Sequence, residues 1–215
     1  MTIGREDRRQ RLVDPRSGSW SSSSQDFVRL ATLLFEQSEL YARSIDGNCS
    51  PYGLAGIPVL FSAFRALLIE ANTGIFGLCR RPGLLPELAA ASSELKFFRS
   101  YYSVKEPFAV QLEVLWEVRN EMVHPSHMPA GTSHGTPEYL LVLREQGLLQ
   151  STNREDVDYN WVSQLQSHRL FTHAFATIES AADVVLSTHH PTKDAHDMHL
   201  QSYRQYREIN SQVFP

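Results

Sequence analysis

Apolar residues recur every three or four positions along most of this chain, and no region is rich in strand patterns. An α-helix has about 3.6 residues per turn, so this spacing gathers the apolar side chains on one face. A helix with one apolar face must cover that face by packing against other elements. The sequence therefore predicts an all-α protein built as a bundle of helices.

The first two helices are expected in the first third of the chain. One begins at Gln25, and its apolar stripe consists of Phe27, Leu30, Ala31, Leu34, Tyr41 and Ile45. Asp46-Gly47-Asn48 supplies turn residues after it. The second covers residues 57–71 and ends at the Asn72-Thr73-Gly74 signal. Because the second helix is apolar on most sides, we expect it at the centre of the bundle.

Three further helices are expected downstream. One covers residues 88–102, and the next follows Pro107 and runs from about Phe108 to His124. A long final helix begins near Tyr159 and keeps its apolar spacing to residue 185. Between them, residues 139–149 suit either a short helix or a strand. The pattern thus predicts four or five main helices.

Changes in composition divide the chain into three parts. Residues 1–24 hold five arginines and a Ser/Gly stretch, which is typical of a disordered basic arm. Residues 25–188 form the expected helical domain. Residues 189–215 form a polar tail with four histidines and a possible short helix at 200–209. Residues 1–24 lack an apolar stripe and residues 188–199 hold few apolar groups, so these two segments are expected to be mobile and removable without unfolding the bundle.

The composition also restricts where this protein works and on what. The net charge of the 215 residues is −4, whereas proteins that coat long nucleic acids are normally basic. Any RNA chemistry is therefore expected at a local site. The chain has two cysteines and a charged amino terminus, and no apolar run approaches the ~18–20 residues that span a bilayer. These features favour a cytoplasmic protein without membrane contact.

The most informative motif lies at the end of the fourth helix. Arg119, Asn120 and His124 occur in the run Arg-Asn-Glu-Met-Val-His, which Pro125 follows at once. Metal-independent RNA cleavage needs a group that moves protons at the 2′-hydroxyl and the departing 5′-oxygen, and a cation for the phosphorane charge. Histidine titrates near neutral pH and arginine is always charged. We therefore take Arg119, Asn120 and His124 as candidate catalytic residues.

This run resembles the R-x(4–6)-H motif of the HEPN family, and the order of helices around it is similar to that family over residues 25–188. The resemblance implies a HEPN-like bundle and a metal-independent endoribonuclease of the toxin–antitoxin, defence or stress-response type. It implies His124 as general acid/base, Arg119 as the transition-state cation, and Asn120 as the residue that orients His124 or binds phosphate. It also implies an RNA substrate and, for many members, a nucleotidyltransferase-like antitoxin partner.

The directions of the Arg119 and His124 side chains bear on whether the site needs a second copy of this chain. Arg119 falls on the apolar stripe of its helix, while His124 lies about 140° away at 100° per residue. One Arg–His pair therefore diverges, and the resemblance implies a two-fold homodimer with facing motif helices. Glu113, Glu117 and Glu121 line the opposite face, where they repel phosphate and offer His124 an ion pair.

Other classes of function have weaker support in the sequence. His124, His127 and His134 lack the spacing of a zinc site, and no phosphate-binding glycine loop or Gly-x-Ser-x-Gly motif occurs. No metal and no cofactor are expected. The structural alternative is that Arg119 forms an ordinary salt bridge and His124 ends its helix. The functional alternative is a non-catalytic helical module for interaction or regulation, with metal-dependent hydrolysis as a more distant third.

Overall fold

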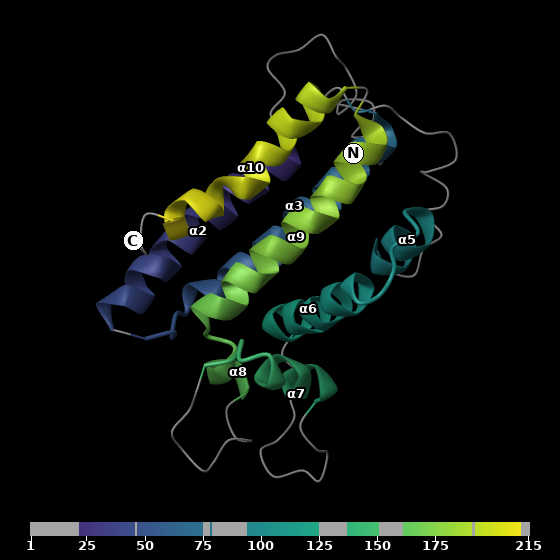
Figure 1. Cartoon of the computed structure of the whole chain (residues 1–215). Helices are drawn as coiled ribbons and strands as arrows, with labels where there is room; N and C mark the ends of the chain where they lie inside the picture. Colours follow the sequence, from purple (N-terminus) through teal and green to yellow (C-terminus); the bar gives the residue numbers. More distant parts are fainter. Residues whose placement is uncertain are drawn as a thin grey trace, which may run out of the picture.

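The computed structural model describes residues 22–45, 47–74, 78, 94–124, 137–150, 161–190 and 192–211. Within these ranges there are eight helices and no strand, apart from an isolated bridge between Cys49 and Ser167. Helices α2, α3, α9 and α10 run alongside one another, and α6 lies across the end of this group (Figure 1). The predicted all-α class is confirmed.

Helices α2 (Ser23–Ser44) and α3 (Tyr52–Thr73) form the most extensive helix pair. The Ser22 hydroxyl caps α2 by accepting a hydrogen bond from the Gln25 amide, and Gly74 ends α3 in the left-handed conformation (φ 70°). Helix α3 contacts α2, α6 and α9, so the expectation of a central second helix is confirmed. The start of α2 differs from the predicted boundary, because residues 22–24 belong to it and not to an arm.

The face of α2 that enters the core is not the predicted one. The buried apolar side chains are Val28, Ala31, Phe35 and Ala42. Of the predicted stripe, only Ala31 is buried, whereas Phe27, Leu30, Tyr41 and Ile45 are exposed. The helix carries two neighbouring apolar stripes, and Phe35 selects the second by packing its ring edge-on against Phe171 and Phe175.

The predicted final helix is broken into two. Helix α8 (Trp161–Gln164) stops before Ser167, and α9 (His168–His189) starts after it. The Ser167 hydroxyl caps α9 through the Leu170 amide and donates to the Leu148 carbonyl. Asn48 also reaches this point, because its carbonyl accepts from the His168 amide at 2.8 Å. The break is thus fixed by contacts with two distant segments.

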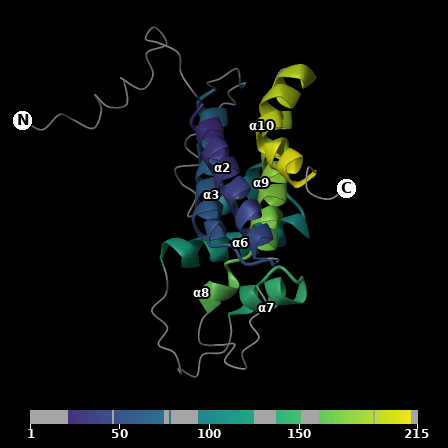
Figure 2. The ribbon, with the colours of Figure 1, turned by 90° about the vertical axis from the view of Figure 1, so that its left-hand side faces the viewer.

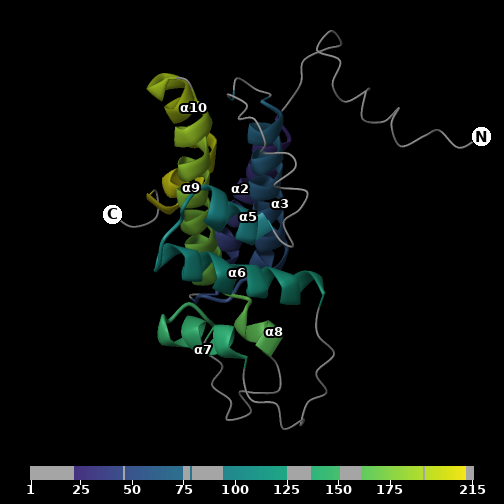
Figure 3. The ribbon, with the colours of Figure 1, turned by 90° about the vertical axis from the view of Figure 1, so that its right-hand side faces the viewer.

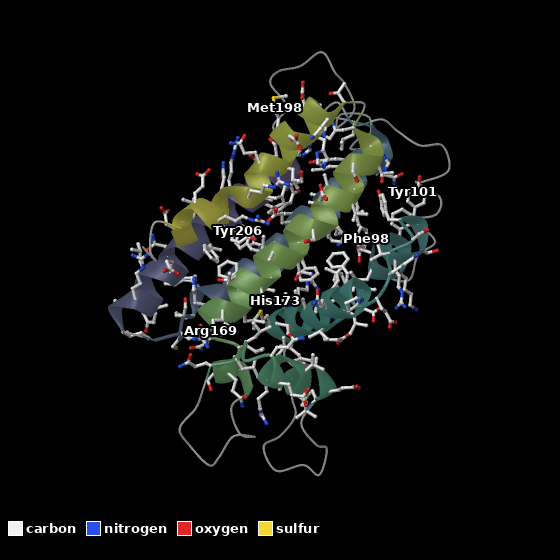
Figure 4. All side chains as sticks on the ribbon, viewed as in Figure 1. Phe98, Tyr101, Arg169, His173, Met198 and Tyr206 are labelled. Atoms are coloured by element: carbon white, nitrogen blue, oxygen red, sulfur yellow. The ribbon has the colours of Figure 1, made fainter. Side chains whose placement is uncertain are left out.

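The expected polar tail is instead the fifth long helix of the bundle, α10 (Lys193–Ser211). It packs against α9 and α2, and Leu200, Tyr203 and Tyr206 are buried there. The Tyr206 ring stacks on Phe175 at 4.8 Å between centroids and lies between α10 and α9 (Figure 4). These few apolar residues all lie on one face of α10, which packs the tail into the bundle, and the removal of residues 188–199 stays a prediction.

The remaining helices cover one end of the bundle. Helix α6 (Phe108–Val123) lies between the α3–α9 layer above and α7 (Glu138–Glu145) below, and α5 (Glu94–Tyr101) sits beside it (Figure 3). The start of α6 after Pro107 is confirmed. Residues 139–145, which suited a helix or a strand, are helical in α7. The expected helix over residues 88–102 is observed from Glu94, and its first part lies outside the described residues.

One helix corrects the expectation about membrane-spanning segments. By length and composition, α3 is apolar enough to cross a bilayer, with a mean hydropathy of 1.7. Its side chains nevertheless form the centre of the core, where Ile57, Leu60, Leu67 and Leu68 are fully buried. This placement is that of a core helix.

Candidate functional site

The motif residues lie in the last two turns of α6. His124 is the residue that ends the helix, with φ −132° and ψ 70°, and its amide donates to the Asn120 carbonyl at 2.7 Å. Its imidazole is exposed. The helix stops here because the residue before a proline avoids helical geometry, and Pro125 follows. His124 is therefore held at a helix end with its ring open to solvent.

Arg119 is half-buried one turn earlier. Its guanidinium carbon lies 5.3 Å from the centroid of the Trp116 ring, and Trp116 packs edge-on against Phe61 of α3. The Arg119 Nε is buried and has no hydrogen-bond partner among the residues that the structure describes. In the described part of the chain no carboxylate forms an ion pair with Arg119, so the salt-bridge alternative does not hold there. The cation is positioned by an aromatic ring of its own chain.

Asn120 connects the arginine to the histidine side of the helix. Its side-chain oxygen accepts a hydrogen bond from an Arg119 terminal nitrogen at 3.1 Å. Asn120 lies four residues before His124, which places both on one helical face. The structure thus brings Arg119 and Asn120 together, although no contact between Asn120 and the His124 ring is observed. The role that the sequence suggested for Asn120, which is to orient the histidine or to bind phosphate, stays a prediction.

Carboxylates lie near this motif, as expected. Glu113 is bound to Arg99 at 2.9 Å, and Glu117 is exposed. Glu121 is half-buried close to Tyr139 of α7. The pKa of Tyr139 is raised by burial and by the negative charges of Glu121 and Glu117. Among the described residues none of these carboxylates forms an ion pair with His124.

Two residues near the motif were not singled out from the sequence. Trp116 contacts the guanidinium of Arg119, and Tyr139 presents a buried hydroxyl below α6 that has no hydrogen-bond partner within the described ranges. Trp116 lies three residues before Arg119, a spacing at which two side chains meet on a helix, so this contact was detectable. Tyr139 was not, because it arrives from another helix.

A serine–histidine–glutamate cluster lies at the interface of α2 and α9. The Ser38 hydroxyl is 2.9 Å from His168 Nδ1, and Glu39 pairs with His168 Nε2. The residue types match those of a hydrolase triad. However, Ser38 is 0% exposed, so no substrate reaches its hydroxyl. We assign this cluster to holding α2 against α9.

The histidines do not form a metal site in the part of the chain that the structure describes, where no group of three or more potential ligands occurs. His127 and His134 lie outside the described residues. The tail histidines were expected to be exposed, but His189 and His199 are buried where α9 meets α10. His190 Nε2 lies 3.1 Å from His199 Nδ1, and His189 bonds to the Tyr102 hydroxyl at 2.9 Å.

Comparisons of this chain with protein-family models, curated proteins and solved structures find no match.

Proposed function

We propose that this protein is a metal-independent endoribonuclease of the HEPN type, with its site at the end of α6. The observation that carries the proposal is the state of Arg119. Three glutamates lie on the same helix, yet within the described residues Arg119 pairs with none of them and rests on Trp116. A half-buried guanidinium without a counterion is suited to bind an anion, since a phosphate supplies the charge and acceptors that it lacks.

The proposed reaction uses the two ends of the motif. His124 accepts the proton of the RNA 2′-hydroxyl, whose oxygen attacks the adjacent phosphorus and displaces the 5′-oxygen. The 5′-oxygen takes up a proton as it leaves, so the products carry a 2′,3′-cyclic phosphate and a 5′-hydroxyl. Arg119 stabilises the phosphorane charge, and Asn120 holds the guanidinium toward the His124 side of α6.

The setting and partners are part of the proposal. The substrate is cellular or invading RNA in the cytoplasm, in a toxin–antitoxin, defence or stress-response role. A nucleotidyltransferase-like protein is the proposed antitoxin. The apolar contacts of Arg119 come from its own chain, namely Trp116, so its burial no longer argues for a dimer through the motif helix. A homodimer is also part of the proposal.

The test is an RNA cleavage assay in EDTA with purified full-length protein. We expect cyclic-phosphate products from wild type and no visible cleavage from His124→Ala, since a general acid/base contributes roughly 10²–10⁴-fold. Arg119→Ala should fail likewise. Arg169→Ala is the matched control, because Arg169 is an exposed arginine at the start of α9, away from α6 (Figure 4). Cleavage that needs a metal, or that survives loss of His124, excludes this mechanism.

The acidic surroundings of the motif favour a second candidate, a non-catalytic helical interaction module. Glu117 and Glu121 lie within two turns of His124 on the same side of α6, and their negative charge repels a phosphate backbone. This candidate predicts that wild type and His124→Ala bind the same protein partner and that neither cleaves RNA. The same assay therefore separates the two functions.

A further inference from the structure

Helix α2 has a second apolar stripe that the described residues of its own chain leave uncovered. We define the α2 seam as the outward-facing positions Phe27, Leu30, Leu34, Gln37, Tyr41 and Ser44. Leu34 is half-buried and the others are exposed. Leu33, Leu40 and Ile45 flank the seam and are also exposed. The bundle uses the neighbouring stripe of Val28, Ala31, Phe35 and Ala42, so packing among the described residues does not explain the seam.

The spacing within the α2 seam is that of a helix–helix contact. Its six positions follow one another at intervals of three, four, three, four and three residues. This alternation is the heptad pattern of two helices that pack at a shallow angle. It continues over the whole of α2, from its first turn to its last. A long straight helix is therefore the shape of partner that fits.

The seam also complements itself when two copies run in opposite directions. In an antiparallel register centred between Leu34 and Gln37, Leu30 faces Tyr41 of the other copy, and the large Phe27 faces the small Ser44. A two-fold axis repeats each of these pairs, so one surface serves both chains. We propose that the α2 seam is the surface through which two copies of this chain form an antiparallel dimer.

The size of the surface agrees with a dimer. Six large apolar residues of α2 and its C-cap are between 39% and 58% exposed, namely Phe27, Leu30, Leu33, Leu40, Tyr41 and Ile45. They present on the order of 500 Å² of apolar surface per copy, more than half of the roughly 800 Å² per partner in a standard interface. No seam position is charged. Asp26 flanks the seam in the first turn of α2, whereas the charged residues Arg29, Glu36 and Arg43 lie around the helix from it.

This interface is separate from the cleavage site. Helix α2 lies nearest the viewer in Figure 2, and α3 and α9 stand between it and α6. Helix α6 shows fewer exposed large apolar residues in the described structure, namely Val110 and Val123. The α2 dimer is therefore independent of the proposed function, and either can fail without the other.

Light scattering after size-exclusion chromatography of the full chain tests the proposal. We expect wild type at twice the mass of one chain, and Leu30→Asp at the mass of one chain. A two-fold axis places two aspartates in each interface, so the dissociation constant should rise at least about 100-fold. Leu141→Asp is the matched control, because Leu141 of α7 is 42% exposed and Leu30 is 45% exposed. It should remain a dimer.

A charge-pair rescue tests the antiparallel register. In the double variant Leu30→Asp/Tyr41→Lys, the new carboxylate faces the new ammonium of the other chain twice, so the dimer should return. In a parallel pair each new charge would meet its own kind, and the protein would stay monomeric. A monomeric wild type, a dimeric Leu30→Asp or a monomeric Leu141→Asp overturns the interface. A double variant that stays monomeric overturns the register.

Discussion

Gly56 lies where helices α3 and α9 approach each other, and it has no Cβ atom that would hold them apart. A Cβ at this position of α3 would overlap the ring carbons of Phe171 in α9. Phe171 is fully buried and its ring is also packed against Phe35 and Phe175, so it has no space to move. Glycine at position 56 therefore allows α3 and α9 to approach closely.

We expect Gly56→Ala to destabilise the protein, because the added methyl forces the Phe171 ring or a helix to shift. Overpacking of this kind costs about 1–3 kcal/mol. Gly53→Ala is the control on the same helix, where a Cβ would meet ordinary contacts at 3.5 Å and 3.6 Å. It should leave stability unchanged or raise it by up to about 1 kcal/mol through helix propensity. Urea unfolding of both variants measures the difference, and equal midpoints would contradict the argument.

At the scale of elements, α10 is held by both apolar and charged contacts. Tyr203 and Tyr206 of this helix are buried. Glu179 of α9 is 5% exposed and accepts from Arg204 Nε at 3.0 Å and from the Tyr206 hydroxyl at 3.1 Å. Because a buried carboxylate needs such partners, α9 and α10 depend on one another. This helix is part of the folding unit.

Tyr203→Ala should lower the free energy of unfolding by about 3–5 kcal/mol, as expected when a fully buried aromatic side chain leaves a cavity. Met198→Ala is the control within α10, because Met198 is 72% exposed near the start of this helix (Figure 4). Its effect should stay within about 0.5 kcal/mol. Urea denaturation followed by circular dichroism measures both. A Tyr203→Ala protein as stable as wild type would show that α10 adds nothing to the bundle.

At the scale of the whole molecule, the junction of α9 and α10 should make the fold sensitive to acid. Burial, followed by the nearby His190 and His196, lowers the pKa of His199 from 6.5 to about 4. Burial, followed by His196 and His189, also lowers the pKa of His190. The other groups at this junction are Asp183 and Asp197, which hold His196, and the Tyr102 hydroxyl on His189.

The sign of the effect follows from which state binds the proton first. In the unfolded chain His199 takes up a proton near pH 6.5, whereas in the folded protein it resists until about pH 4. The free energy of unfolding should therefore fall as the pH drops from 7 toward 4, by on the order of 2 kcal/mol from this residue. Urea unfolding at pH 7 and pH 5 should show a smaller loss in His199→Gln. An identical loss in both proteins would contradict this assignment.

Local sequence signals determined several features of this protein. The apolar spacing gave the all-α class, Pro107 and Pro125 bounded α6, and Gly74 ended α3. These signals succeed because the helical repeat, the fixed proline φ and the freedom of glycine act on a few neighbouring residues. The Arg119–Asn120–His124 motif was visible for the same reason.

Where the local sequence allowed two structures equally well, the tertiary structure decided which one formed. Helix α2 has two apolar stripes, and only the packing of Phe35 against α9 determined which one was buried. The break before α9 needed Asn48 and Leu148, and the role of α10 needed the surface that α2 and α9 form together. Likewise, Tyr139 reaches the motif from another helix. Such contacts join residues far apart in the chain, so no local pattern in the sequence encodes them.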